Sequence, residues 1–260
     1  MIPKIIHFCW FGGNTKPDFI KECIKSWELF LPGYKIIEWN EKNTEFTNKF
    51  VKNAYKLKQW AFVSDYVRLE KLHQLGGVYL DTDMLLVKNI DNLLTSKMFI
   101  GCENKHTISA GIIGAQKEHT FLKQLLDNYS DLKINKFTNL YDIAIPKVIT
   151  TYFRNKYDYT NHFDVILEFD DMTIYPSDYF YSLPSLNMYK NRSYKEFITA
   201  NSYAVHLWGE SWLKPSEFEL LRNGKYTVGI KSAFYSFYQQ ENKLKYIKKI
   251  ISSIKQSFYR

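Results

Sequence analysis

The segment AFVSDYVRLEKLHQLGGVYLDTDM, residues 61–84, places a helix, two glycines, a strand and two acids in direct succession. The apolar residues of its first part recur at helical spacing and share one face: Phe62, Tyr66, Leu69, Leu72 and Leu75. Gly76 suits the left-handed position that caps a helix, and the apolar run VYL after Gly77 predicts a short strand. We therefore expect a helix over residues 59–75 that leads directly into a strand of a parallel or mixed sheet.

The same alternation of strand and helix continues along the chain. Apolar runs predict strands at residues 4–10, 34–39, 97–103, 110–115, 164–169, 173–176 and 203–208. Helical spacing predicts helices at residues 17–30, 119–129 and 141–153. This order predicts the α/β class, with a Rossmann-like mixed sheet flanked by helices.

Composition limits the class of protein. A chain of 260 residues, 45% of them hydrophobic, can bury a core of its own and is not disordered. Because it contains no run of eighteen apolar residues and no leader-like cleavage site, we expect neither a spanning helix nor a secretory signal. Cys9, Cys23 and Cys102 lack CxxC spacing, which argues against a disulfide framework or a zinc site and favours a reducing cytoplasm.

The net charge of +8 is concentrated at the end of the chain. Residues 225–260 contain eight basic residues and one acid, Glu241, so the other residues are close to neutral. We therefore expect no nucleic-acid partner for the body of the protein. The shift in composition divides the chain into a catalytic domain, residues 1–224, and a basic amphipathic helical tail, residues 225–260.

Asp81 and Asp83 are the first candidates for chemistry. In an extended chain alternate residues point to one side, so the two carboxylates would lie together and share a face with Tyr79. Two such charges repel unless one is protonated or a cation lies between them. Oxygen ligands suit Mg²⁺ or Mn²⁺, and the apolar flanks place the pair at the carboxyl edge of a core strand, where α/β sheets bind ligands. A solvated turn at the end of the strand is the alternative.

Three segments in order resemble glycosyltransferase family 32: IPKIIHFCW at 2–10, SDYVRL with GGVYLDTDM at 64–84, and VHLWGESW at 205–212. That family includes bacterial capsule and lipopolysaccharide enzymes and fungal mannosyltransferases, and the glucosylating domain of large bacterial toxins is related to it. The resemblance implies a GT-A type fold and a metal-dependent, retaining hexosyltransferase. It also implies a nucleotide-sugar donor, with UDP-galactose or UDP-glucose expected, and a saccharide or lipid-linked oligosaccharide acceptor in bacterial surface polysaccharide synthesis.

The resemblance also implies roles for residues of the first two segments. Trp10 would lie against the nucleotide base, Asp65 and Arg68 would contact ribose or donor-sugar hydroxyls, and Tyr79 would lie near the base or ribose. Asp81 and Asp83 would hold the metal ion, and with Arg68 they are the expected catalytic residues. A core position for Trp10 and a surface ion pair for Asp65 and Arg68 are the alternatives.

The third segment would complete the site. His206 is the expected further metal ligand, with Glu210 as the alternative, and neutral imidazole is a reasonable ligand for Mn²⁺. A buried core histidine is the structural alternative. Ser211 and Trp212 would close over the leaving diphosphate, one donating a hydroxyl and the other an indole N–H.

The sugar side of the site is less defined by the resemblance. Relatives commonly carry an asparagine near the place where this chain has Ser109 and Ala110, which puts that contact in doubt. Glu103 and Asn104, at the end of the preceding strand, are weaker candidates for that side. No nucleophile is identified from the sequence.

The tail carries an apolar stripe at helical spacing: Leu244, Ile247, Ile250, Ile251, Ile254 and Phe258. Most of its lysines lie beside or opposite that stripe. A basic amphipathic helix can lie in an anionic membrane surface, or it can pack on the domain with a solvated basic face. Both remain open, so we expect a cytoplasmic protein, with peripheral attachment to the inner face of the cell membrane as the alternative.

Two other functions are compatible with parts of the sequence. A phosphatase of the haloacid-dehalogenase type also ends an apolar strand in Asp-x-Asp, but that motif normally opens the chain and continues with Thr or Val where this chain has Leu85. A non-enzymatic protein that binds carbohydrate or an anionic surface would account for the 17% aromatic residues and the basic tail. It would leave the paired acids unexplained.

Overall fold

The computed structural model describes residues 1–135, 138–169, 171–184, 193–209, 217–222, 224–238 and 243–258. The chain divides into two compact units, Met1–Gly209 and Glu210–Arg260. The expected functional division after residue 224 stays a prediction. Among the described residues, no helix has both the length and the apolar character needed to cross a membrane.

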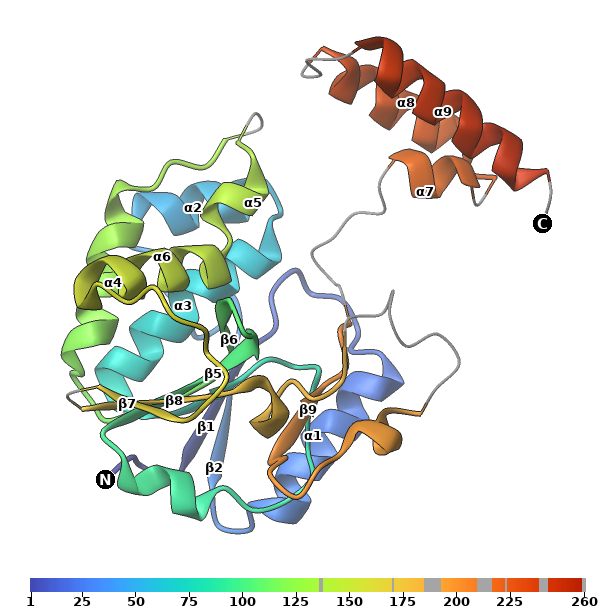
Figure 1. The fold of residues 1–260 in the computed structure, drawn as a ribbon. Coiled ribbons are helices and arrows are strands. Elements are labelled where there is room, and N and C mark those ends of the chain that lie inside the picture. The colour runs from blue at the N-terminus through green and yellow to red at the C-terminus, as the bar shows by residue number, and fades with distance from the viewer. Residues whose placement is uncertain are drawn as a thin grey trace. The chain divides into compact units, whose positions relative to one another are not determined.

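The first unit is built on a seven-stranded mixed sheet with strand order β2-β1-β3-β6-β5-β8-β7 (Figure 1). Its strands are β1 Ile5–Cys9, β2 Lys35–Trp39, β3 Gly77–Leu80, β5 Met98–Asn104, β6 Thr107–Ala115, β7 Leu167–Phe169 and β8 Met172–Tyr175. β1 runs parallel to β2 and β3, and β5 runs parallel to β8, whereas β6 is antiparallel to both β3 and β5. The mixed sheet of the expected α/β class is therefore confirmed.

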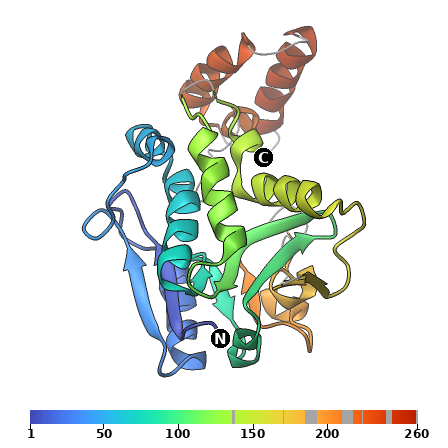
Figure 2. The ribbon, with the colours of Figure 1, turned by 90° about the vertical axis from the view of Figure 1, so that its left-hand side faces the viewer.

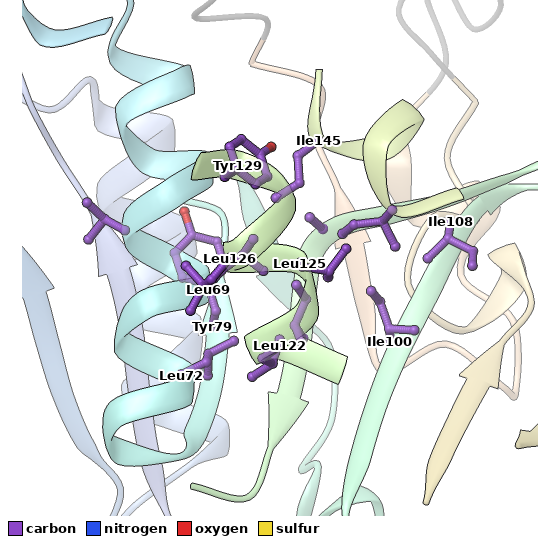
Figure 3. Close-up of a cluster of buried hydrophobic side chains, with 14 of the residues drawn as sticks. Leu69, Leu72, Tyr79, Ile100, Ile108, Leu122, Leu125, Leu126, Tyr129 and Ile145 are labelled. Carbon is purple, nitrogen blue, oxygen red and sulfur yellow. The ribbon is translucent and has the colours of Figure 1, made fainter. Parts of the chain in front are cut away.

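One face of the sheet is covered by helices from the middle of the chain. These are α2 Lys49–Lys56, α3 Trp60–Leu75, α4 Thr120–Asp131, α5 Leu140–Ile143 and α6 Ile145–Tyr157, and Figures 1 and 2 show them gathered on this side. Leu69 and Leu72 of α3 pack with Leu122 and Leu125 of α4 in the larger hydrophobic core (Figure 3). Burial of this apolar face is the main favourable contribution to folding.

The other face carries a smaller core. It is covered by α1 Asp18–Phe30, by the 3₁₀ turn Asp91–Thr95, and by a second sheet of two strands, β4 Met84–Leu86 and β9 Ala204–His206. Trp27 of α1 is fully buried, and its indole N–H donates to the Met84 carbonyl at 2.7 Å. This hydrogen bond fixes β4, the strand that directly follows Asp83. Two further 3₁₀ turns, Ser177–Tyr179 and Tyr194–Phe197, lie in the segment that leads to β9.

The helix and glycine cap expected before the acids are confirmed. α3 ends at Leu75, and Gly76 follows with a φ of +67°. A side chain there would be strained, and its Cβ would lie 2.8 Å from the backbone nitrogen of Lys117. The tight connection delivers the chain from α3 directly into β3, in the centre of the sheet.

The two acids do not continue β3 as an extended strand, and that expectation is wrong. β3 ends at Leu80, and the Met84 N–H donates to the Asp81 carbonyl at 3.0 Å, so Asp81–Asp83 form a turn. The physical reason is that β4 leaves the main sheet and pairs antiparallel with β9, with Met84 opposite His206. This pairing was not predicted, because nothing local in the sequence marks it.

In the described residues of the second unit, the helices are α7 Glu217–Arg222, α8 Tyr226–Phe237 and α9 Lys243–Ser257. α7 packs against both α8 and α9. The buried Tyr246 of α9 donates its hydroxyl to Glu217 Oε1 at 2.7 Å, which ties α9 to α7. The expected C-terminal helical extension is confirmed by α8 and α9, which both lie within residues 225–260, whereas α7 was not predicted.

Candidate active site and metal centre

Asp81, Asp83 and His206 converge at the carboxyl end of β3. Each offers one possible ligand atom, and these atoms lie within 4.8 Å of one another. The turn after β3 supplies the two acids, and the β4–β9 pairing brings His206 beside them from a distant part of the chain. The structure thus unites the three residues expected to hold the metal ion, while the role itself stays a prediction.

Asp81 is held by the side chains of Arg68 and Tyr79. Arg68 Nη1 lies 3.1 Å from Asp81 Oδ1, and the Tyr79 hydroxyl donates to the same oxygen at 3.0 Å. The guanidinium also lies over the Tyr79 ring, with Cζ 4.5 Å from the centroid. Both contacts hold Oδ1, which fixes the orientation of the carboxylate. The structure shows Tyr79 buried behind Asp81, and its expected contact with a base or ribose stays a prediction.

Asp65 and Arg68 form a buried ion pair, so the alternative of a surface pair is wrong. Each residue is 5% exposed, and Arg68 Nη2 lies 2.9 Å from Asp65 Oδ1. Burial raises the pKa of Asp65 to about 7. The Arg68 charge opposes this rise, and the Asp81 charge adds to it. Arg68 also donates to the Ala110 carbonyl at 2.8 Å. The buried cation therefore links two acids to β6.

Asp83 is held by groups from β9 and the residues after it. Asp83 Oδ1 lies 3.2 Å from His206 Nε2, and Oδ2 accepts from the Gly209 N–H at 2.7 Å. Burial alone would raise the pKa of Asp83, but the His206 charge and these hydrogen bonds lower it below its ordinary value. Burial alone would lower the pKa of His206, but Asp83, Asp81 and Glu103 raise it above 6.5. Asp83 and His206 thus stabilise each other as an ion pair.

The residues present fit a divalent cation. Two carboxylates and an imidazole are the donors expected for Mn²⁺, or for Mg²⁺ with water completing the shell. His206 Nδ1 is buried without a hydrogen-bond partner in the described part of the chain. A Cβ at Gly111 would lie 3.1 Å from Asp81 Oδ2 and 3.6 Å from His206 Cδ2, so the glycine keeps the space beside both residues open. Asp81, Asp83 and His206 would hold such a cation, which would supply positive charge beside the two carboxylates.

Trp10 leaves the sheet at the same edge as the two acids. β1 and β3 are parallel, with His7 opposite Tyr79, and Trp10 directly follows β1. Its indole N–H donates to the Asn14 carbonyl at 2.6 Å, and Lys16 Nζ lies 5.5 Å from the ring centroid. The residue is half-buried rather than sealed in the core. Its stacking on a base stays a prediction.

Tyr181, which the sequence did not assign, and Glu103, a weaker candidate for the sugar side, adjoin His206. The Tyr181 ring centroid lies 5.5 Å from that of His206, and a backbone bridge pairs Tyr181 with Val205. Glu103 is part of the same electrostatic neighbourhood: burial raises its pKa, while the His206 charge and a hydrogen bond from Ser109 oppose the rise. Tyr181 lies in an aromatic loop without any spacing signal, so sequence reasoning could not have found it. Glu210, Ser211 and Trp212 lie outside the described residues.

Residues 17–100 match the family described as "Glycosyltransferase sugar-binding region containing DXD motif". That range contains Asp65, Arg68, Tyr79, Asp81 and Asp83, but neither Trp10 nor His206. Residues 17–100 are therefore similar to a glycosyltransferase DXD region.

Curated relatives agree with this assignment. The chain is 26% identical to inositol phosphoceramide mannosyltransferase 3 of Schizosaccharomyces pombe, over 52% of this chain and 39% of that protein. It is 26% identical to lactosylceramide 4-alpha-galactosyltransferase of Mus musculus, over 58% of this chain and 42% of that protein. It is also 26% identical to uncharacterized glycosyltransferase L373 of Acanthamoeba polyphaga mimivirus, over 82% of this chain and 84% of that protein. The chain spans about two fifths of the first two relatives, and together the comparisons support the expected enzyme class, a glycosyltransferase.

Proposed function

We propose that this protein is a metal-dependent, retaining hexosyltransferase that uses a nucleotide-sugar donor. The observation that carries the proposal is the convergence of Asp81, Asp83 and His206 within 4.8 Å, inside a chain whose DXD region matches a sugar-transferase family. Breaking a glycosyl phosphate bond places negative charge on the leaving diphosphate, and a bound divalent ion would neutralise that charge.

The residues of the chain would orient this chemistry. Arg68 and Tyr79 fix Oδ1 of Asp81, and the Gly209 N–H fixes Oδ2 of Asp83, so neither acid needs to reorganise when a cation binds. His206 would exchange its proton for the metal ion. Trp10 would stack on the base, and Ser211 and Trp212 would donate to the diphosphate, as the resemblance implies.

The donor and acceptor belong to the proposal as well. UDP-galactose or UDP-glucose is the proposed donor; one of the relatives is named as a galactosyltransferase, which supports galactose, and another as a mannosyltransferase, which supports a hexose in general. The proposed acceptor is a saccharide or a lipid-linked oligosaccharide in bacterial surface polysaccharide synthesis. Both of those relatives are named for glycolipid products or acceptors, which supports an acceptor that has a lipid part. The cytoplasm, or its membrane face, is the corresponding location.

The family match favours this function over the two alternatives. A haloacid-dehalogenase-like phosphatase would also use paired acids, and a non-enzymatic carbohydrate-binding protein would need none. The matched region is described as a sugar-binding region of glycosyltransferases and covers the acids themselves. The buried position of Arg68 beside them is a further feature that a simple binding surface would not require.

The test is a screen of nucleotide sugars by thermal shift, with and without Mn²⁺, followed by assay of donor hydrolysis. One donor should stabilise the protein only with the metal ion, by about 2.7 kcal/mol at 100 times its Kd. Asp83→Asn should lose both the shift and at least a thousandfold of the activity, whereas the exposed control Asp131→Asn should keep both. Failure with every nucleotide sugar, or full activity of Asp83→Asn, would overturn the proposal.

A further inference from the structure

We propose that the C-terminal unit docks on the surface of an anionic lipid bilayer. The docking face consists of the exposed apolar stripes of α8 and α9 and the lysines that border them. This proposal does not depend on the transferase activity, because it rests on the second unit alone.

The stripe of α9 is exposed although its residues are apolar. Leu244, Ile247, Ile251 and Phe258 are 74%, 40%, 49% and 74% exposed, respectively. Their spacing of three, four and seven residues places them on one side of the helix. The buried residues Tyr246 and Ser253 lie on a different side, which faces the rest of the unit. The stripe therefore lies largely outside the surface by which α9 packs on α7 and α8; Phe258 is the exception, since its ring stacks on that of Tyr226 in α8 with centroids 6.2 Å apart.

α8 presents a second stripe of the same kind. Ile230 and Phe234 of α8 and Tyr238, the residue that caps its C-terminus, are each more than half exposed and recur every four residues, so they lie along one side. Ala233, on another side, is buried. α7 contacts both helices, and Figure 1 shows α8 and α9 next to each other with α7 across them. A surface with this many large exposed apolar side chains marks an interaction site.

The charge of the unit identifies the partner. Residues 210–260 contain ten basic and four acidic residues, a net charge of +6, which is most of the +8 of the whole chain. Lys248 and Lys255 are exposed. They lie four residues after Leu244 and Ile251, respectively, which are both members of the α9 stripe. A stripe of aliphatic side chains bordered by lysines matches a bilayer interface, with acyl chains for the apolar groups and anionic head groups for the ammonium groups.

The helices fit a position on the membrane surface rather than across it. α9 has fifteen residues, and lysines recur along its whole length. A spanning helix needs about twenty predominantly apolar residues. A flat lipid surface also accepts apolar stripes from two helices without the shaped complementarity that a protein partner would need.

The experiment is co-sedimentation of the full chain with vesicles of phosphatidylcholine alone or of phosphatidylcholine mixed with phosphatidylglycerol. The chain should sediment with the anionic vesicles and should be released by high salt. Lys248→Gln/Lys255→Gln should weaken partitioning roughly thirtyfold, which corresponds to about 1 kcal/mol per lysine. Leu244→Ser/Ile251→Ser should weaken it at least tenfold, because serine has no apolar surface to bury.

Matched controls lie in the first unit. Lys52→Gln/Lys133→Gln removes the same charge, and Leu29→Ser/Val165→Ser removes exposed apolar groups of similar size. Both control variants should partition like the unaltered chain, and circular dichroism should show equal helix content in all variants.

Three results would overturn the proposal. The first is equal binding to neutral and anionic vesicles, or equal loss of binding in the control variants. The second is a dimer in sedimentation velocity that Leu244→Ser/Ile251→Ser dissociates, which would show that a second copy covers the face. The third is a lower melting temperature of the Leu244→Ser/Ile251→Ser variant without vesicles, which would show that the face is already buried against protein.

Discussion

The two sides of the candidate metal centre are built from different kinds of interaction. On one side, Asp81 is held by Arg68, whose guanidinium stays charged: burial opposes its charge, but Asp81, Tyr79 and Asp65 raise its pKa well above the ordinary value. On the other side, Asp83 is held by His206, an imidazole whose pKa is raised above its ordinary value by Asp83, Asp81 and Glu103 against the effect of burial. The charge that holds Asp81 is permanent, whereas the proton that holds Asp83 can be exchanged for a metal ion. We call Asp81 with Arg68 and its neighbours the permanent side, and Asp83 with His206 the exchangeable side.

This difference suggests a division of labour between two neighbouring acids. The permanent side keeps Asp81 in place before any ligand arrives, which lowers the reorganisation that binding would require. The exchangeable side avoids the cost of two uncompensated carboxylates when the metal ion is absent, because the imidazolium supplies a charge in its place. Each of the following substitutions changes the interactions that hold Asp81, those that hold Asp83, or both.

Arg68→Met should have the largest effect on stability. It leaves Asp65 and Asp81 without their buried cation, and breaking a buried ion pair in this way costs about 3 to 5 kcal/mol. Because the pKa of Asp65 is already raised to about 7, the carboxyl should take up a proton at low pH and recover part of the loss. Urea unfolding at pH 5 and pH 8 should therefore show a larger deficit at pH 8.

Arg154→Met is the control for the loss of an arginine. Arg154 Nη1 donates to the carbonyls of Tyr159 and Asn161 and has no acid partner among the described residues, so its loss should cost about 1 kcal/mol without a difference between pH 5 and pH 8. An equal cost for both substitutions, or no pH dependence for Arg68→Met, would contradict the permanent character of the Asp81 side.

The permanent side was the easier one to predict from sequence. Asp65 and Arg68 are three residues apart on a helix, and Tyr79 is two residues from Asp81, so local spacing relates the members of each pair. The contact of Arg68 with Asp81 joins α3 to the turn after β3 and was not predicted. The burial of the Asp65–Arg68 pair was not predictable in the same way, because it depends on α6 and β6, whose distance from α3 is a tertiary property. Local spacing identified the members of each pair, and tertiary packing determined their burial and the strength of their interactions.

The exchangeable side depended on contacts that no local rule supplies. His206 entered through a resemblance among three separated segments, not through spacing. The turn at Asp81–Asp83 was missed because the pairing of β4 with β9 that causes it is a long-range contact. Gly111 and Tyr181 gave no sequence signal at all, since an ordinary strand glycine and an aromatic loop residue occur in any α/β protein. Non-local pairing is the part of this site that sequence could not provide.

His206 should make the metal-free protein less stable as the pH rises. The folded protein holds the His206 proton above pH 6.5, where the unfolded chain releases it, so the pair with Asp83 contributes fully below pH 6.5 and is lost as the pH passes the raised pKa. We expect His206→Gln to cost about 1.5 to 3 kcal/mol at pH 6 and progressively less at higher pH. Melting curves in EDTA between pH 5.5 and pH 9 measure this difference.

The same series provides two checks. Binding of Mn²⁺ should displace the proton, so the shift in melting temperature caused by the metal ion should grow with pH in the unaltered protein. His119→Gln is the control of opposite sign: burial lowers the pKa of His119 more than Asp171 raises it, so the stability that the residue contributes should fall as the pH drops through 6.5. Parallel pH profiles for the two variants would contradict the assignment of His206.

Gly111→Ala should have the smallest effect, and it tests both sides at once. Gly111 lies on β6, close to residues of both sides. An added Cβ would lie 2.7 Å from the Tyr181 hydroxyl, 3.1 Å from Asp81 Oδ2 and 3.6 Å from His206 Cδ2. Its backbone is extended, so the substitution adds volume without left-handed strain, and overpacking of this size should cost about 1 to 2 kcal/mol. Because Oδ1 of Asp81 is held by Arg68 and Tyr79, the carboxylate cannot swing away, and the methyl group must displace Tyr181 or His206. We therefore expect calorimetry to show weaker Mn²⁺ binding together with a smaller pH dependence of stability. A loss of metal binding with an unchanged pH profile would mean that Asp81 yields instead, and that the side held by Arg68 is the more deformable one.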